Sequence, residues 1–267
     1  MKILEGVFDP ITQEELEYFL DYRKNNQIKD LYISVKEEGI LPLNQRIELL
    51  KNSIRPYPHL HIYIGNQTKE SIPSKYQETE EKVRNGNFYL ACKGIRNILN
   101  EKGFYYENIA ENLCNEHRYL HSISVAKTAS KLAEMHNLDK NIAYRMGLLH
   151  DITKRWNDEQ GEELLKIYYP KGLEYDPKVW HSFTCPFFIK KNLCITDQRI
   201  LNAIWHHTLG DGCSDYDHIL YIADKIEPLR GYDTSKEWDI ASRSLKAAAH
   251  YVLEESKAYR NKTEGKQ

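Results

Sequence analysis

The sequence has no Cys-x-x-Cys pair, no apolar run close to the length of a membrane span, and no excess of basic residues. Its five cysteines are scattered, which favours reduced thiols over disulfides or a thiolate metal site. A transmembrane helix needs about 20 consecutive apolar residues, and residues 1–5 become acidic too early for a signal peptide. These absences predict a cytoplasmic protein that has no membrane partner.

The charges of the chain are balanced, with 37 Lys and Arg residues, 39 Asp and Glu residues and a formal net charge of -2. Non-specific nucleic-acid binding requires a broad positive field, so we expect no nucleic-acid partner. A local basic pocket for a phosphorylated small molecule is compatible with this balance. With 267 residues, of which 41% are hydrophobic, the chain is long enough for two domains of ordinary size.

Strand-like and helix-like patterns alternate over the first hundred residues. Alternating apolar residues predict strands at residues 3–8, 31–35 and 60–64. Helical spacing predicts helices at residues 14–25, after a cap at Asn44, and at 88–101. The polar stretch 67–87 has no clear period and is expected at the surface. This order predicts a small, parallel, Rossmann-like α/β domain over residues 1–105.

The strand pattern disappears after Tyr105, and only helical periodicity remains. Helices are predicted at residues 111–136, 140–149, 158–169, 197–206, 217–227 and 236–259. The charged tail, residues 260–267, is expected to be frayed. The second domain, residues 106–267, is therefore predicted to be an all-α helical bundle.

His121 lies at helical spacing with Val125 and Ala129, so its side chain is expected to point into the core. Taken alone, such a histidine is more often an ordinary core residue than a metal ligand. The pair His150-Asp151 follows the apolar end of a predicted helix, which strengthens the case for a site.

Asp224 stands within another apolar helical run, residues 219–226. A buried carboxylate needs a cation or several hydrogen bonds, and one divalent metal would satisfy Asp224 together with His121 and His150-Asp151. Lys225 offers Asp224 a surface ion pair as the alternative. Mixed imidazole and carboxylate ligands suit Fe, Mn or Zn better than Mg or Ca.

The order His121, His150-Asp151, Asp224 resembles the signature of the HD superfamily of metal-dependent phosphohydrolases. The short motifs around these residues are similar to those of bacterial symmetrical bis(5'-nucleosyl)-tetraphosphatases, which split diadenosine tetraphosphate into two ADP. These motifs occupy residues 116–122, 150–154, 179–181, 203–208 and 221–230. The resemblance implies an HD-domain bundle, a small-molecule nucleotide substrate, and a homodimer as one assembly that the chain could form.

The resemblance also implies a metal. His121, His150, Asp151 and Asp224 match the family's iron ligands, so a divalent metal is expected, most simply Fe, with Mn or another first-row metal as alternatives. Asp151 could hold the metal and orient the attacking water, which would make it a catalytic residue as well.

Further matches imply substrate contacts. Arg118, Lys154 and Arg230 correspond to phosphate-contacting positions of the family, although most lysines and arginines are simply solvated at the surface. His181 and His207 correspond to two more site histidines, able to contact phosphate or a second metal. Lys154, His181 and His207 are expected to take part in catalysis with Asp151 and also to bind substrate.

The chain departs from the tetraphosphatase pattern after its His-Thr word. His206 aligns with a position that is not histidine in the family, and Asp211 stands where the family usually has an arginine. An acid in place of a base would remove one cationic contact to a polyphosphate and add repulsion. We therefore expect an altered nucleotide preference rather than a different reaction.

The first domain resembles the adenylyltransferases of NAD synthesis, at residues 6–10, 45–50 and 95–105. That family places a His-x-Gly-His turn after the Asp-Pro pair, whereas this chain has Thr12-Gln13-Glu14-Glu15. The carboxylates of Glu14 and Glu15 thus stand at the helix N-terminus where a triphosphate would bind, and they would repel the triphosphate oxygens. The domain is interpreted as a degenerate nucleotidyltransferase-like remnant with a structural or docking role.

The leading hypothesis is metal-dependent symmetrical hydrolysis of dinucleoside tetraphosphates. An HD phosphohydrolase of another nucleotide, such as a nucleoside mono- or triphosphate, is the alternative within the same class. A nucleotide-binding regulator is a hypothesis of a different class, and the complete set of metal ligands argues against it. An active adenylyltransferase in the first domain is opposed by Thr12 and Glu15.

Overall fold

A computed structural model describes residues 1–264, which form two compact units. The first unit contains residues 1–109 together with 191–195, and the second contains residues 110–190 and those from Thr196 onward. All five cysteines carry free thiols. No helix within residues 1–264 combines the length and apolar character that a membrane span needs.

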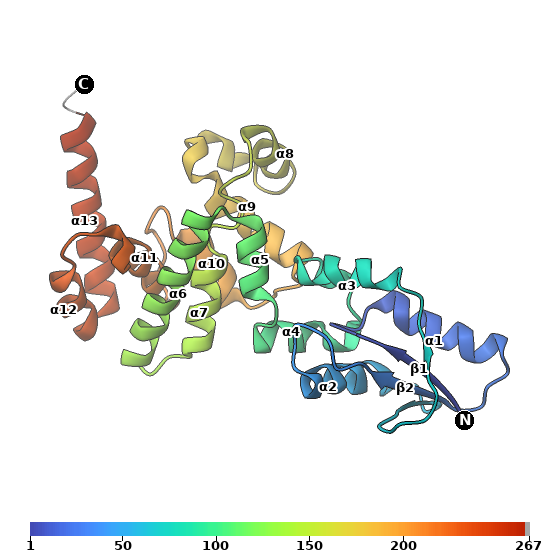
Figure 1. The fold of residues 1–267 in the computed structure, drawn as a ribbon. Coiled ribbons are helices and arrows are strands. Elements are labelled where there is room, and N and C mark those ends of the chain that lie inside the picture. The colour runs from blue at the N-terminus through green and yellow to red at the C-terminus, as the bar shows by residue number, and fades with distance from the viewer. Residues whose placement is uncertain (265–267) are drawn as a thin grey trace. The chain divides into compact units, whose positions relative to one another are not determined.

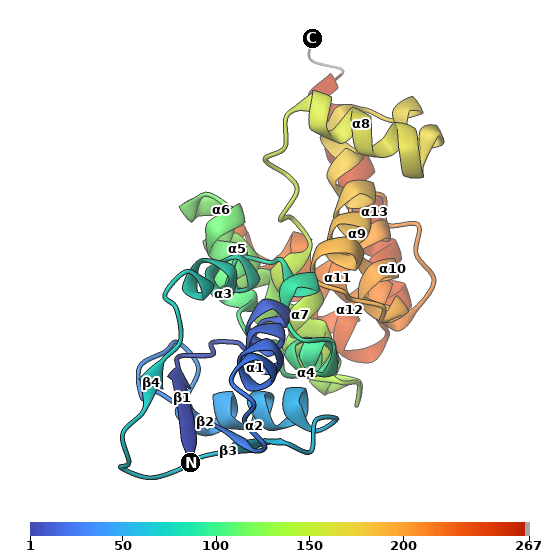
Figure 2. The same ribbon diagram turned by 90° about the vertical axis from the view of Figure 1, so that its right-hand side faces the viewer.

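The first unit is built on a four-stranded parallel sheet with the order β3-β2-β1-β4, of which Figure 1 labels β1 and β2 and Figure 2 labels all four strands. The strands are β1 (Lys2–Gly6), β2 (Leu31–Val35), β3 (Leu60–Ile62) and β4 (Glu70–Ser71). Apolar strand residues such as Leu4 and Ile33 are completely buried, as expected for a sheet that is covered by helices. The predicted α/β class of this part of the chain is confirmed.

The helices of this unit are α1 (Gln13–Asn25), α2 (Leu43–Ile54), α3 (Tyr76–Arg84) and α4 (Arg96–Lys102). Pro42, not Asn44, occupies the N-cap of α2, because proline has the backbone angle that a helix start needs and no N–H to satisfy. The polar stretch 67–87, expected at the surface, is mostly exposed, but it also contains β4 and α3, which the sequence did not predict. The predicted helix at 88–101 is divided into two 3-10 turns and α4.

Helix α3 escaped prediction because its inner face is largely polar. Its buried residues are Tyr76, Thr79, Glu80 and Val83, which have helical spacing but include a threonine and a glutamate. Hydrophobic periodicity detects a helix only when the buried face is apolar. Two contacts explain the buried acid, since Glu80 accepts a hydrogen bond from Phe8 N (3.0 Å) and forms an ion pair with Arg84 (3.5 Å).

Arg46 holds together the loops that follow β1 and β2. Its side chain is buried, and its guanidinium donates hydrogen bonds to the carbonyl oxygens of Leu41 (2.8 Å), Val7 (2.7 Å) and Glu37 (2.7 Å). Arginine suits this position because its planar group presents several donors in fixed directions. The ends of both strands are thereby fixed at one edge of the sheet.

Glu15 occupies the N-terminus of α1, where the transferase family would bind phosphate. Its Oε2 accepts hydrogen bonds from Thr12 N (2.8 Å) and Thr12 Oγ1 (2.9 Å), and Thr12 caps the helix in return. Burial raises the pKa of Glu15 well above its usual value, and the neighbouring Glu80 carboxyl raises it further. Burial also raises the pKa of Glu80.

These raised pKa values predict a pH-dependent stability of the first unit. A carboxyl whose pKa is higher in the folded state contributes stability below its unfolded pKa and loses it as pH rises through the folded pKa. Glu15→Gln should therefore raise the melting temperature relative to wild type by several degrees, on the order of 4–8 °C per kcal/mol, at pH 8 but not at pH 5. Calorimetric scans at both pH values measure this difference. Glu17→Gln, an exposed change on the same helix, should show no such dependence.

The second unit is entirely helical over its described residues, as predicted. Its principal helices are α6 (Glu116–Met135), α7 (Lys140–Leu149), α8 (Asp158–Tyr168), α9 (Trp180–Asn192), α10 (Gln198–His206), α11 (Asp215–Ile226), α12 (Ser235–Arg243) and α13 (Leu245–Glu264). A separate helix, α5 (Tyr106–Leu113), precedes α6, and Asn115 caps α6. The single helix predicted at 236–259 is broken at Ser244, whose backbone is extended.

Two further corrections concern α9 and the tail. Helix α9 was not predicted, because it is buried over most of its surface and contains Pro186, so it has no amphipathic pattern. Residues 260–264 were expected to be frayed but continue α13, whereas 265–267 lie outside the described residues.

Helix α11 is the centre of this unit. It packs against α6, α7, α10 and α13 (Figure 2). Helices α6 and α7 approach each other closely at Gly147, where an added Cβ would lie only 2.6 Å from the Cα of Ala126. Glycine is needed here because any side chain would meet the backbone of α6. The packing of α6, α7 and α11 brings three residues together: His121 in α6, His150 directly after α7, and Asp224 in α11.

Candidate metal centre

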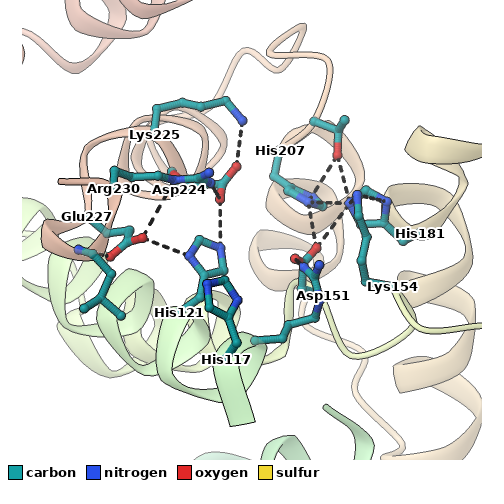
Figure 3. Close-up of a pocket in the computed structure, with 13 residues that line it drawn as sticks. His117, His121, Asp151, Lys154, His181, His207, Asp224, Lys225, Glu227 and Arg230 are labelled. Atoms are coloured by element: carbon teal, nitrogen blue, oxygen red, sulfur yellow. Dashed lines mark hydrogen bonds and ion pairs between the residues drawn. The ribbon is translucent and has the colours of Figure 1, made fainter. Parts of the chain in front are cut away.

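A cavity of about 500 Å³ lies in the helical unit and is lined almost entirely by charged and imidazole side chains. Figure 3 shows these side chains converging from α6, from the segment after α7, and from α9, α10 and α11. Eight of the nine residues proposed from the sequence line it: Arg118, His121, Asp151, Lys154, His181, His207, Asp224 and Arg230. The ninth, His150, is fully buried beside them.

His121 lies between two carboxylates (Figure 3). Its Nε2 is 3.1 Å from Asp224 Oδ1, and its Nδ1 is 3.0 Å from Glu227 Oε1. Burial alone would lower the pKa of His121, but the hydrogen bonds to these two acids raise it. Glu227, which is itself buried, thus fixes the orientation of the ring.

His150 presents an unpaired nitrogen to the same place. Its Nδ1 donates a hydrogen bond to Gly147 O (2.7 Å), so the lone pair of the neutral ring is on Nε2. Burial lowers the pKa of His150 to about 3, and its Nε2 has no hydrogen-bond partner. This atom lies 3.7 Å from Asp151 Oδ2 and 3.9 Å from Asp224 Oδ1. A buried acceptor surrounded by carboxylate oxygens requires a cation.

A second group of potential ligands shares Asp151. His181 Nε2 lies 3.2 Å from Asp151 Oδ1 and 3.2 Å from His207 Nε2. His207 Nδ1 donates to Ile204 O (2.6 Å), which directs its Nε2 into the cavity. Burial lowers the pKa of His181 to about 4, so the His181 ring that faces the carboxylate is neutral at neutral pH.

The donor atoms fit a metal. One group, His121, His150 and Asp151, and another, Asp151, His181 and His207, each place their ligand atoms within 4.8 Å of one another. Asp224 adds its carboxylate to the first group through the distances given above. Imidazole and carboxylate donors in this mixture favour a first-row transition metal.

Cationic side chains surround these carboxylates. Arg118 forms an ion pair with Asp151, and Lys225 Nζ and Arg230 Nη2 each lie 2.7 Å from a carboxylate oxygen of Asp224. Burial would raise the pKa of Asp224, but Lys225 and His121 hold it well below its usual value. Both acids are therefore ionised at neutral pH, and the cations beside them can also meet an anionic ligand.

Lys154 stands at the opposite side of the cavity. Its Nζ lies 2.8 Å from His181 Nδ1 and donates to Lys178 O (2.9 Å). Burial lowers the pKa of this lysine. The ammonium group is thus held in place by the segment before α9 rather than extended into solvent.

Two contributors were not assigned roles from the sequence. Glu227 stands three residues after Asp224, and Thr208 Oγ1 lies 3.2 Å from both His181 Nε2 and His207 Nε2. Lys225, considered from the sequence only as an ion-pair partner of Asp224, does form that pair and also lines the cavity. The sequence does hold a signal for Glu227, because it is an acidic residue directly after the apolar run 219–226. Its partner His121 is 106 residues away, however, so only the tertiary structure reveals the contact.

The expected effect of Asp211 is not supported by its position. Asp211 is exposed, its Oδ1 lies 2.7 Å from His206 Nδ1, and neither residue lines the cavity. The two residues by which this chain departs from the tetraphosphatase pattern therefore interact with each other. His206, which aligns with a position that is not histidine in the family, thus lies outside the cavity.

Comparison with known proteins identifies the helical unit. Residues 118–229 match the family model of the HD domain. This part of the chain is an HD domain. The HD match contains the histidine and aspartate positions described above, from His121 to Asp224, and it confirms the resemblance inferred from the sequence.

Relatives of the chain carry related names. A protein of Mycoplasma pneumoniae, named probable nicotinate-nucleotide adenylyltransferase/Ap4A hydrolase, is 30% identical over 169 residues, 60% of this chain and 48% of the relative. The symmetrical bis(5'-nucleosyl)-tetraphosphatase of Bacillus subtilis is 32% identical over 120 residues, 44% of this chain and 64% of the relative. The chain therefore spans less than two thirds of either relative.

The chain is also similar to a solved structure of an HD hydrolase. That hydrolase is a protein of Clostridium acetobutylicum described as a predicted HD superfamily hydrolase involved in NAD metabolism. The similarity has a TM-score of 0.55 at 28% sequence identity, and it covers 59% of this chain and 86% of the other.

Proposed function

We propose that the chain is a metal-dependent phosphohydrolase that splits diadenosine tetraphosphate symmetrically into two ADP. The observation that carries this proposal is the buried, unpartnered Nε2 of His150, which lies among His121, Asp151 and Asp224 in a cavity rich in cations. The names of the relatives from Mycoplasma pneumoniae and Bacillus subtilis support the choice of substrate.

In this proposal His121, His150, Asp151 and Asp224 hold the metal, and iron is the expected occupant. When bound, such a metal supplies Lewis acidity for the attack of water on a phosphoryl group. Asp151 orients the attacking water, since its Oδ1 points toward His181 and His207. His181 can donate its Nε2–H to this carboxylate, which lies 3.2 Å away, and so helps to fix the orientation of Asp151.

The cations of the cavity bind the phosphate chain. Arg118, Lys154 and Arg230 neutralise charge on the phosphoryl oxygens, which is the main demand of a loose transition state for phosphoryl transfer. Lys154 is held rigidly by Lys178 O, so it loses little conformational freedom when a phosphate binds.

The first unit is proposed to be a separate domain, near residues 1–105, that does not transfer nucleotides. A cavity of about 630 Å³ lies at the strand ends that bind nucleotides in related sheets. Its lining carries the carboxyl groups of Asp9, Glu38, Glu78, Glu80 and Glu81 against the guanidinium of Arg84. With the helix N-terminus already satisfied by Glu15, a triphosphate finds repulsion there. A docking role, a cytoplasmic location and a homodimer stay predictions.

The reaction is tested by incubating the full chain with diadenosine tetraphosphate and Fe²⁺ or Mn²⁺ and separating the products by ion-pair chromatography. ADP alone is the expected product. ATP together with AMP would show asymmetric cleavage and overturn the proposal. Turnover of nucleoside mono- or triphosphates in place of the dinucleotide would favour the alternative, an HD phosphohydrolase of another nucleotide.

Lys154→Ala and Arg230→Ala should lower kcat/KM for the tetraphosphate while the bound metal changes little. Loss of one charge-assisted hydrogen bond is worth roughly 1.5–3 kcal/mol, or about one to two orders of magnitude in kcat/KM. Steady-state kinetics and metal analysis on the same preparations separate the two effects. Lys140→Ala, an exposed change at the start of α7, is the matched control. Wild-type kinetics in both variants would remove these side chains from the phosphate site.

A further inference from the structure

A second cavity, of about 440 Å³, adjoins the HD site in the same unit. It is lined by residues from the segment after α7, from the start of α8, and from the segment that leads into α9. Lys154 and His181 line both this cavity and the metal cavity. The two spaces therefore meet at the lysine that we place on phosphate. A volume of this size falls within the range of pockets for small organic ligands.

Two indole rings form the walls of this second cavity, those of Trp156 and Trp180. The Trp180 ring is fixed by a hydrogen bond from its Nε1 to Tyr175 O (3.0 Å). Gly161 of α8 lies against the same ring, where a Cβ would be 3.2 Å from its Cε3. The Trp156 ring packs edge-on against Phe188, with ring centroids 5.6 Å apart. Both indoles are half-buried and preorganised, so stacking on them costs little ordering.

The charges differ between the two cavities. The metal cavity presents Arg118, Lys225 and Arg230 to a ligand, whereas the second cavity has two carboxylates, Asp158 and Asp176, beside two lysines, Lys154 and Lys178. Phosphate groups are therefore favoured in the metal cavity, because the charges that line the second cavity balance one another. The carboxylates suit a neutral group that carries hydrogen-bond donors, such as the hydroxyls of a ribose or the amino group of a purine.

We propose that this second cavity is a nucleoside-binding subsite, in which the base of one half of the substrate stacks on Trp156 and Trp180. The inference rests on the proposed function, because a dinucleoside tetraphosphate has a nucleoside at each end of its phosphate chain. With phosphates along Lys154, the chain passes from the metal cavity into the second cavity, and one nucleoside enters the space between the indoles. The subsite makes the second nucleoside a determinant of substrate selection.

The test compares diadenosine tetraphosphate, as substrate, with inorganic tetraphosphate, a competing ligand that lacks both nucleosides. In Trp156→Leu and Trp180→Leu, the KM for the dinucleotide should rise roughly 10- to 100-fold, the range expected for loss of one base–aromatic stack. The inhibition constant of inorganic tetraphosphate should not change, because this ligand has no base to stack. Trp156→Phe and Trp180→Phe keep a stacking surface and should stay close to wild type. Trp238→Leu on α12, outside both cavities, is the matched control.

Binding of radiolabelled adenosine, measured by equilibrium dialysis, tests the subsite without hydrolysis. Adenosine binding should be weakened in both leucine variants and retained in Trp238→Leu. If wild type cleaves the dinucleotide but the leucine variants behave like the control, the subsite is overturned and the proposed function stands. If wild type does not cleave it, the proposed function fails, and dialysis alone then supports or overturns the subsite. Circular dichroism and the phenylalanine variants separate loss of stacking from loss of folding.

Discussion

His150→Ala is expected to lower turnover of diadenosine tetraphosphate at least about 1,000-fold and to abolish retention of metal. The ring of His150 offers a buried lone pair that nothing else in the described chain satisfies, so its removal takes away a ligand without a substitute. Asp151→Asn should act in the same direction, because Asp151 belongs to both ligand groups. Metal analysis and ADP release on the purified variants measure the two effects.

His206→Ala is the matched control for these changes. His206 precedes His207 in the chain but pairs with Asp211 outside the cavity, so its loss should leave metal and turnover unchanged. Circular dichroism should show native helicity in all three variants. Wild-type turnover in His150→Ala or Asp151→Asn would contradict the assignment of the metal centre.

Gly147→Ala is expected to damage both stability and activity, although residue 147 does not line the cavity. The new methyl group would meet the backbone of Ala126 at 2.6 Å, so α6 and α7 must separate. Overpacking of this kind costs typically 1–3 kcal/mol. Because α6 carries His121 and α7 leads into His150, the separation also moves ligands apart, and a shift of about 1 Å in a site can cost roughly 100-fold in rate.

Thermal unfolding, bound metal and turnover should all decline together in Gly147→Ala. Asn141→Ala, an exposed change on the same helix, should alter none of them. A Gly147→Ala protein that melts and turns over like wild type would show that the helix crossing is not close. A protein that is destabilised but fully active would separate the crossing from the placement of the ligands.

Much of the fold follows from local patterns in the sequence. Strand β2 has apolar residues at alternate positions, and α7, α8 and α10 have apolar faces opposite polar ones, so their periods predict them closely. The patterns failed where burial is not one-sided. The inner face of α3 includes Thr79 and Glu80, and α9 is buried nearly all round, so neither shows the period of an amphipathic helix.

The sequence by itself determined the chemical identity of the site, because His121, His150-Asp151 and Asp224 are recognisable from residue type, order and apolar surroundings. Only the tertiary structure decided which other residues lie close to them. The contact of Glu227 with His121, the close crossing at Gly147 and the shared cavity wall of Trp180 and Lys154 each join segments that are separated in the chain. The periodicity of a sequence predicts which face of a helix a side chain lies on, but the packing of whole helices determines which partner that side chain contacts.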